Sequence, residues 1–202
     1  MKTQAHLKFN DLAPDLEVTT AEGKKIRLSS LWAEKPLVLA FTRHFGCAQC
    51  KEMLDQLVQN KPQLQASGLD LVVVTQAKPE ESSQFIAARA PGVLCLADPE
   101  RELYHAYGLG RGTVGQTLLS PKIWSANARA LAEKGYKAEL PPPGQDAFLM
   151  SGSFIIATDG RVRLPYYYDH IADHPSADLL LKGFLSTDWN SPFEAPLGPK
   201  SK

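Results

Sequence analysis

The chain is poor in cysteine, with only three in 202 residues. A number this small, and odd, excludes a scaffold held together by disulfides. A structural zinc site takes about four Cys or His ligands. The chain has a single C-x-x-C pair, and its His170 and His174 are followed by Pro175 and form no H-E-x-x-H motif. We therefore expect no metal and no other bound cofactor.

The sequence also lacks an excess of charge of either sign and long apolar runs. Its 22 Lys and Arg residues balance 22 Asp and Glu residues, and the pI is about 7.0. This balance gives no support to a nucleic-acid partner. No run of about 18 apolar residues is present, as a membrane span would require. The first eight residues, MKTQAHLK, have no apolar core of a secretory signal, so we predict a cytoplasmic protein.

Hydrophobic residues make up 44% of the chain, which is enough to fill one core, so we predict a single domain over residues 1–202. Apolar and alternating runs predict a β-hairpin and strands, whereas 3.6-residue spacing with Pro or Gly at the ends predicts helices. The predicted hairpin covers 16–28, with strands at 37–41, 69–75, 93–97, 152–157 and 161–168 and helices at 47–66, 79–90, 100–107, 120–133 and 175–185.

Residues 110–148 interrupt this rhythm and are predicted to be an insertion. Glycines at 110, 112 and 115 indicate a flexible entry, and a helix follows, on which Trp124, Ala128 and Leu131 share one face. The run Pro141–Gly144 is a stiff, non-helical connector. We expect this segment to be a lid or a dimer contact, and a homodimer stays one option. Residues 187–202 are predicted to be a loose tail.

The order of elements predicts an α/β protein with a thioredoxin-like fold. Strands 37–41 and 69–75, joined through a helix, need a parallel crossover, whereas the last two strands meet at Asp159-Gly160 and must be antiparallel. A βαβ half followed by a ββα half is the thioredoxin-like plan. We therefore expect a central mixed sheet flanked by helices, with an N-terminal β-hairpin.

Cys47 and Cys50 carry the chemistry that the sequence predicts. They follow a buried strand and a short bend, at the start of a helix. Helix N-terminal N–H groups and nearby cations lower a thiol pKa, and Arg43 and His44 come just before Cys47. We expect Cys47 to attack a peroxide or a disulfide and Cys50 to resolve the product as a Cys47–Cys50 disulfide.

For the two residues His44 and Arg43, the sequence leaves two interpretations open, whereas for Cys95 it favours one. His44 is equally consistent with a base or substrate-orienting residue and with a half-exposed loop histidine. Arg43 is equally consistent with binding a peroxide oxygen or lowering the thiolate pKa and with a surface arginine. Cys95 lies between two leucines of a predicted strand and is expected to be inert packing.

Two segments carry a resemblance to a known family. The stretch 41–52 (FTRHFGCAQCKE) and the stretch 98–109 (DPERELYHAYGL) resemble the peroxiredoxin-like branch of the AhpC/TSA antioxidant proteins, a branch that includes prostamide/prostaglandin F synthase. A third match is GSFII at 152–156, before an Asp-Gly turn. The typical peroxiredoxin motif P-x-x-x-T/S-x-x-C is absent, because Ala40 and His44 stand at its Pro and Thr/Ser positions before Cys47.

The resemblance implies a thioredoxin-like fold and a redox-active Cys47–Cys50 pair. Many relatives place a cis-proline opposite the cysteines, where this chain has Gly152 between two serines. We therefore expect Gly152 and Ser153, together with Thr42 and Phe45, to face the substrate.

The function predicted from these observations is a thiol-dependent oxidoreductase that reduces hydroperoxides or related O–O and S–S bonds. The expected partners are a peroxide or disulfide substrate and an external thiol donor, such as a thioredoxin or glutathione system. Two alternatives stay open: a protein disulfide reductase of the thioredoxin type, and a non-catalytic redox sensor that binds partners through 110–148.

Overall fold

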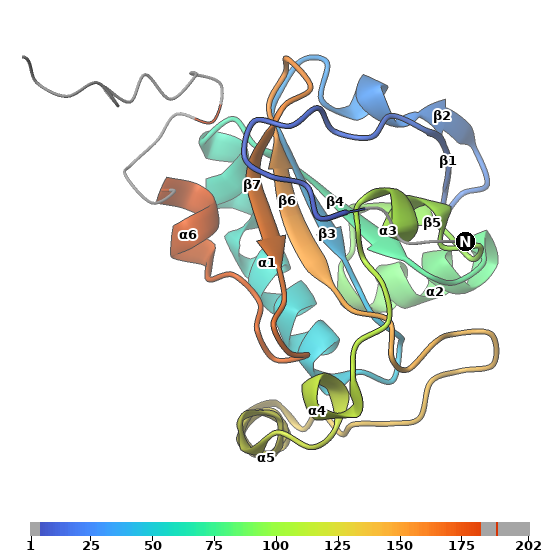
Figure 1. The fold of residues 1–202 in the computed structure, drawn as a ribbon, viewed down its shortest axis with the longest axis vertical. Helices are drawn as coiled ribbons and strands as arrows, with labels where there is room; N and C mark the ends of the chain where they lie inside the picture. The colour runs from blue at the N-terminus through green and yellow to red at the C-terminus, as the bar shows by residue number, and fades with distance from the viewer. Residues whose placement is uncertain (1–4, 183–188, 190–202) are drawn as a thin grey trace, which may run out of the picture.

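A seven-stranded mixed sheet forms the centre of the molecule (Figure 1). The computed structural model describes residues 5–182 and residue 189. The strands lie in the order β2-β1-β5-β4-β3-β6-β7, with β3, β4 and β5 parallel and the other neighbours antiparallel. Their bounds are β1 Glu17–Thr20, β2 Lys25–Arg27, β3 Leu37–Phe41, β4 Asp70–Thr75, β5 Leu94–Ala97, β6 Gly152–Ile156 and β7 Val162–Tyr167.

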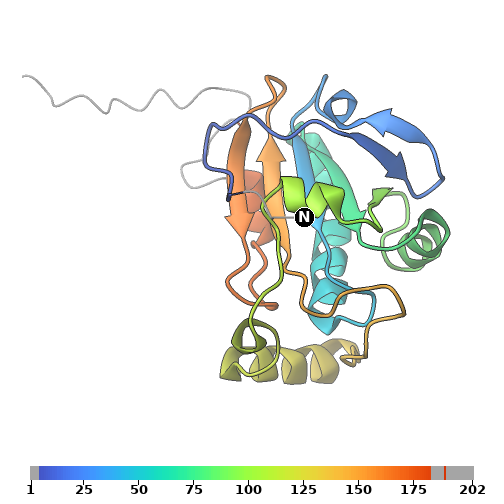
Figure 2. The ribbon, with the colours of Figure 1, turned by 45° about the vertical axis from the view of Figure 1, so that its right-hand side comes forward.

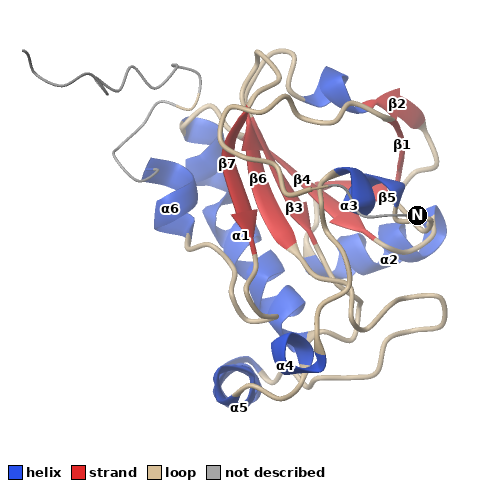
Figure 3. Ribbon diagram, viewed as in Figure 1, coloured by secondary structure: helices blue, strands red, loops and turns tan. Residues whose placement is uncertain are grey.

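Helices cover both faces of this sheet, as Figure 3 shows by colour. They are α1 Ala48–Ala66, α2 Pro79–Arg89, α3 Glu102–Ala106, α4 Val114–Thr117, α5 Pro121–Lys134 and α6 Ala177–Lys182, with the 3-10 turn η1 at Leu28–Leu31. Within the described residues, no helix is both long and apolar enough to cross a bilayer. The predicted mixed sheet, its flanking helices and the N-terminal hairpin β1–β2 are confirmed.

Alternation along the strands divides the core into two layers. Val38 and Ala40 of β3 point to one face, where they pack with Met53 and Leu54 of α1. This layer also contains buried residues of α2 and α6. Leu39 and Phe41 point to the other face, toward the residues of α3 and η1. All five residues of β3 are fully buried, as a strand covered on both faces requires.

The edge at which β3 ends is where the predicted site lies. The parallel pairing aligns Phe41 of β3 with Val74 of β4, so the segments after both strands leave the sheet side by side. The bend after β3 leads directly into α1. In Figure 1 the inserted helices α4 and α5 lie beyond this edge, away from η1 and the β1–β2 hairpin.

The helix predicted over 47–66 is a single helix, α1, although it contains a proline. The helix runs unbroken over 19 residues with Pro62 inside it. A proline ring removes one backbone N–H. Leu57 and Leu64, on either side of it, are both buried in the core, and this packing holds the helix together across Pro62. The predicted start at Cys47 is close: Cys47 is the N-cap and Ala48 the first helical residue.

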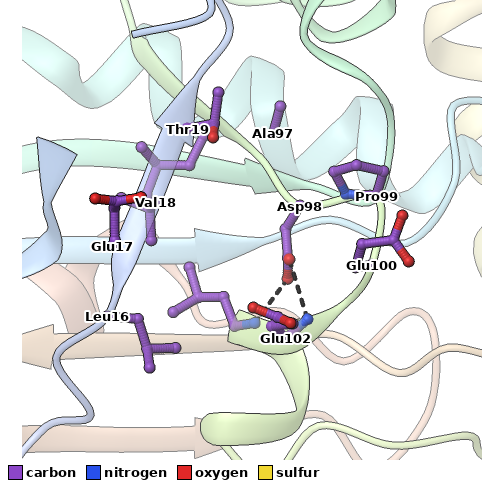
Figure 4. A pocket seen from close by; sticks show the side chains of 11 residues that line it. Leu16, Glu17, Val18, Thr19, Ala97, Asp98, Pro99, Glu100 and Glu102 are labelled. Atoms are coloured by element: carbon purple, nitrogen blue, oxygen red, sulfur yellow. Dashed lines mark hydrogen bonds between the residues drawn. The ribbon is translucent and has the colours of Figure 1, made fainter. Parts of the chain in front are cut away.

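Helix α3 begins later than predicted. The sequence predicts a helix from residue 100, but Arg101 has a left-handed backbone (φ 61°) and the helix begins at Glu102. The Asp98 carboxylate reaches forward and accepts the N–H groups of Glu102, Leu103 and Tyr104 at 3.0, 2.9 and 3.2 Å. It lies in a hollow of about 190 Å³ beside β1, shown in Figure 4, and burial raises its pKa to about 6.

The insertion contains one helix that was not predicted and one that was. The glycine-rich entry includes the short helix α4, which has a capping box between Thr113 and Gln116. Helix α5 crosses below the sheet in Figure 2 and packs against α1. It buries Ile123, Ala126 and Ala130, so the face of Trp124, Ala128 and Leu131 is the exposed one.

The C-terminal helix and tail predicted from the sequence lie only partly within the described residues. Helix α6 is observed at Ala177–Lys182, so it begins two residues later than predicted, and residues 183–185 of the predicted helix lie outside the described residues. The predicted loose tail at 187–202 also lies outside them, except for Trp189, which is buried and donates its indole N–H to the Leu180 carbonyl at 3.1 Å.

We predict that Asp98→Ala destabilises the protein. The change leaves three helix N–H groups without their acceptor, and the loss of such a cap costs about 1–2 kcal/mol in the free energy of unfolding. Urea denaturation at pH 7 measures the difference. The control is Glu100→Ala, because Glu100 is an exposed acidic residue two positions away. Equal stability of the two variants would contradict the capping role.

Candidate functional site

The two thiols of the C-x-x-C pair lie together at the N-terminus of α1. Cys47 is 4% exposed and Cys50 is 5% exposed, and neither forms a disulfide. The Cys47 sulfur accepts the Cys50 backbone N–H at 3.4 Å, which makes it the N-cap of the helix. The Cys50 sulfur accepts the backbone N–H of Arg43 at 3.3 Å. Both sulfurs are therefore held by backbone donors.

Arg43 reaches from the bend after β3 to the Cys47 sulfur. Its Nη1 is 3.5 Å from that sulfur, and its Nε donates to the Leu149 carbonyl at 3.0 Å. Its Nη2 donates to the Ala147 carbonyl. The side chain is 3% exposed. Two carbonyls at the end of the insertion thus fix the guanidinium over the thiol.

These contacts give the two thiols different pKa values. A hydrogen bond from the Cys50 thiol lowers the pKa of Cys47 to about 6, against the opposing effect of burial, and the charge of Arg43 adds to the lowering. Burial, together with the hydrogen bond to Cys47, raises the pKa of Cys50 well above its usual value. At neutral pH Cys47 is therefore a thiolate and Cys50 a protonated thiol. This is the division of roles that a nucleophile and a resolving thiol need.

His44 lies beside the pair as a neutral, buried ring. Burial lowers its pKa to about 4, with further lowering from the charges of Arg43 and Lys51. Its Nδ1 has no hydrogen-bond partner within the described part of the chain. His44 is thus neither half-exposed nor a cation at neutral pH. It lines the pocket described below.

A loop of the insertion covers the bend before Cys47. The Glu139 N–H donates to the Gly46 carbonyl at 2.9 Å, and the Glu139 carboxylate pairs with the buried ammonium of Lys51 at 2.7 Å. A Cβ atom at Gly46 would lie 2.5 Å from the Glu139 carbonyl oxygen. Only glycine permits this approach, so residues 138–141 form a fitted cover over the site.

A pocket of about 300 Å³ opens next to Cys47, between this cover and helices α4 and α5. Its walls are mainly apolar and come largely from the insertion. Trp124 is 59% exposed and Leu140 is 89% exposed, and both line the pocket together with Leu118, Ile123 and Ile171. The Trp124 indole N–H donates to the Leu118 carbonyl at 2.8 Å, which orients the ring. The pocket therefore offers an apolar surface beside a thiolate.

Two residues predicted to face the substrate, Thr42 and Phe45, lie outside this pocket. Thr42 is buried next to β4. Its hydroxyl and its backbone N–H both donate to the Val74 carbonyl, at 3.0 and 2.9 Å. Phe45 stacks on Phe85 of α2 with ring centroids 4.0 Å apart. Its backbone N–H donates to Gln145 at 2.9 Å.

Gly152 and Ser153, the other two predicted substrate-facing residues, belong to the core at the start of β6. Gly152 pairs with Phe41 of β3, and a Cβ there would lie 3.0 Å from side-chain atoms of Leu109 and Phe154. The Ser153 hydroxyl contacts the Tyr168 hydroxyl at 2.9 Å. The structure thus brings Arg43, His44 and Cys47 to the pocket, with Cys50 directly behind Cys47.

Other groups with possible reactivity lie apart from this cluster. Cys95 is buried in β5, and burial raises its pKa to about 12, as suits inert packing. Among the residues that the structure describes, no three His, Cys, Asp or Glu side chains gather as a metal site would require.

Sequence reasoning missed the residues that hold Arg43. Gln76, directly after β4, donates to the Arg43 carbonyl at 2.8 Å. Parallel strands end at the same edge, and this gives a usable signal: a polar residue after the second buried strand falls next to the bend after the first. The carbonyls of Ala147 and Leu149 had no such signal, because backbone acceptors are present at every residue.

The sheet, the helix that begins at a C-x-x-C pair and the antiparallel β6–β7 hairpin define a thioredoxin-like protein. The chain matches the AhpC/TSA family over residues 9–164, and it belongs to that family. The family predicted from the stretches around Cys47 and Asp98 is therefore confirmed.

Curated relatives support this family assignment, and a solved structure supports the fold. The chain is 30% identical over 179 residues to the thioredoxin-like protein AAED1, chloroplastic, of Arabidopsis thaliana, covering 85% of this chain and 71% of that protein. It is 29% identical to the prostamide/prostaglandin F synthase of Salmo salar, covering 77% of each. A yeast mitochondrial 1-Cys peroxiredoxin superposes with a TM-score of 0.60 at 14% identity, over 87% of this chain and 74% of that one. The cytoplasmic location stays a prediction.

We predict that Cys47 reacts with iodoacetamide with a midpoint near pH 6 and that Arg43→Met moves this midpoint upward. Arg43 lowers the pKa of Cys47 by its charge and its hydrogen bond, so without it the thiolate forms at higher pH. Mass spectrometry of Cys47 alkylation between pH 4 and pH 10 measures both curves. Arg129→Met is the control, because Arg129 pairs with Glu52 at the surface and does not contact the thiols. An unchanged midpoint in Arg43→Met would contradict this role.

Proposed function

We propose that the protein is a thiol-dependent peroxidase that reduces small organic hydroperoxides through a Cys47–Cys50 cycle. The observation that carries the proposal is the thiolate of Cys47, held by Arg43 at the wall of an apolar pocket, with a protonated thiol behind it. Membership of the AhpC/TSA family supports the oxidoreductase class. The particular substrate and the cycle are our proposal.

The proposed cycle has three balanced steps. The Cys47 thiolate attacks one peroxide oxygen, the O–O bond breaks, and the alkoxide leaves and takes a proton from solvent. Cys47 is now a sulfenic acid, oxidised by two electrons. The Cys50 sulfur attacks the Cys47 sulfur, its proton and the sulfenic hydroxyl leave as water, and a disulfide forms. An external thiol donor of the thioredoxin or glutathione kind then returns both residues to thiols.

The pocket beside the fitted cover supports a small organic substrate. Residues 138–141 lie on Gly46, and the Cys47 sulfur is reached beside them through the pocket. An organic molecule with an apolar body fits a volume of about 300 Å³, which is at the lower end of ordinary ligand sites.

We predict peroxide consumption that depends on both cysteines in different ways. With a thioredoxin system, the protein consumes cumene hydroperoxide; Cys47→Ser abolishes turnover because the nucleophile is lost. Cys50→Ser retains the first oxidation, and dimedone traps the Cys47 sulfenic acid. NADPH oxidation and mass spectrometry measure the two results. The control is Cys95→Ser, which should turn over like the parent.

Three outcomes, two of which need an insulin-reduction or a partner-capture assay, would contradict the proposed peroxidase cycle. Insulin reduction without peroxide turnover would identify a protein disulfide reductase. Absence of both activities, with partner capture that persists in Cys47→Ala/Cys50→Ala, would identify a binding module. An over-oxidised Cys47 beside a free Cys50 in the parent protein would exclude the resolving step.

We predict that Trp124→Ala reduces the preference for bulky apolar hydroperoxides. The indole forms part of the apolar wall, and its removal takes away contact with the body of such a substrate but little contact with H2O2. The ratio of kcat/KM for cumene hydroperoxide to that for H2O2 should fall about threefold to tenfold, since about 1 kcal/mol of contact is lost. Leu131→Ala is the control, because Leu131 is exposed on the same helix and lies outside the pocket. An equal ratio in both variants would contradict the assignment.

A further inference from the structure

The side-chain amide of Gln76 forms four hydrogen bonds beside the thiol site. Its Nε2 donates to the Arg43 carbonyl at 2.8 Å and to the Asp146 carbonyl at 3.0 Å. Its Oε1 accepts the Asp146 backbone N–H at 2.7 Å and Arg101 Nε at 3.1 Å. Gln76 is buried, and every donor and acceptor capacity of its amide is used. A side chain used so completely fixes the positions of what it binds.

Gln76 binds both the Arg43 backbone and the segment whose carbonyls accept the Arg43 guanidinium. One partner is the Arg43 backbone itself. The other is Asp146, directly before Ala147, whose carbonyl accepts the guanidinium. The Leu149 carbonyl follows three residues after Asp146 and accepts Nε. Gln76 thus joins the residue that carries the guanidinium to the segment that grips it.

Arg101 completes this arrangement from the far side. Its Nε donates to Gln76 and its Nη2 donates to the Gly144 carbonyl at 2.7 Å, so it ties the same segment at a second point. The left-handed backbone of Arg101, at φ 61°, is an uncommon conformation for a residue other than glycine. These two bonds direct the Arg101 side chain toward the segment 144–146.

We propose that Gln76 is a positioning residue for the thiolate: by binding the Arg43 backbone and the Asp146 backbone together, it keeps the Arg43 guanidinium over the Cys47 sulfur. Gln76 contacts neither sulfur in the structure, and its effect on Cys47 passes through Arg43. Without Gln76, the Arg43 and Asp146 backbones lose the side chain that joins them, and among the described residues the bend is tied to segment 145–149 only by the Phe45–Gln145 hydrogen bond and by the guanidinium itself. The guanidinium then samples positions farther from the sulfur, and its charge stabilises the thiolate less.

The test is the pH dependence of Cys47 alkylation, since a residue with only a structural role would lower the stability and leave this midpoint unchanged. We expect Gln76→Leu to raise the midpoint by about one pH unit, which corresponds to a tenfold weaker preference for the thiolate. Gln76→Glu keeps both acceptor bonds but loses both donor bonds, and it too should raise the midpoint. Gln63→Leu is the control, because Gln63 is exposed on α1 far along the helix from the thiols.

A double-variant cycle separates this role from a direct effect. In Arg43→Met/Gln76→Leu the midpoint should equal that of Arg43→Met alone, because Gln76 acts only through Arg43. A fully additive shift would overturn the proposal, as would a folded Gln76→Leu with the parent midpoint. If Gln76→Leu does not fold, the midpoint is measured in Arg101→Leu, where we expect a smaller rise. An unchanged midpoint in both Arg101→Leu and Gln76→Glu would then overturn the proposal.

This inference rests on Cys47 as the nucleophile of the proposed function, yet it fails separately from it. Alkylation uses iodoacetamide and needs no peroxide, electron donor or turnover. Absence of peroxidase activity with a midpoint that moves in Gln76→Leu would remove the proposed substrate and leave the positioning role. Peroxidase activity with a midpoint that does not move would do the reverse.

Discussion

The contact between the Arg43 guanidinium and the Cys47 sulfur is the interaction on which the site depends. It requires that a cation be buried beside a buried thiol, which is costly unless the charge is compensated and the hydrogen bonds are satisfied. The compensation comes from the thiolate itself, and two further donors of the guanidinium bind the carbonyls of Ala147 and Leu149. The charged pair and the loop that surrounds it therefore form one unit.

The insertion and the residues that follow it both bind the Arg43 guanidinium and form the walls around the Cys47 sulfur. Residues 145–149, which lead from the insertion back into β6, supply the acceptors for the guanidinium. Residues 138–141 lie on Gly46 and close one side of the access to the sulfur. Helices α4 and α5 supply apolar walls on the other side. A single segment thus binds the guanidinium beside Cys47 and lines the pocket next to it.

The fold followed from the sequence wherever a local pattern carried the information. The five apolar residues of β3 and the Asp159-Gly160 turn predicted a buried strand and a hairpin, and both are observed. The start of α3 did not follow, because the Asp98 side chain binds N–H groups up to six residues ahead and Arg101 adopts a left-handed backbone. The exposed face of α5 did not follow either, since packing against α1 decides which face is buried.

In the candidate site, too, local sequence predicted some residues and tertiary packing placed the others. The thiols and Arg43 could be named from their spacing, because a helix start fixes what lies within a few residues of it. Thr42 and Phe45 share that spacing, yet their side chains turn to β4 and α2 because the bend changes direction at each residue. Gln76 is 26 positions after Cys50, and only the parallel register of β3 and β4 makes it a neighbour. The proposed nucleophile can therefore be predicted from local sequence, whereas Gln76, which binds the Arg43 backbone, becomes a neighbour only when the folded sheet places β3 and β4 side by side.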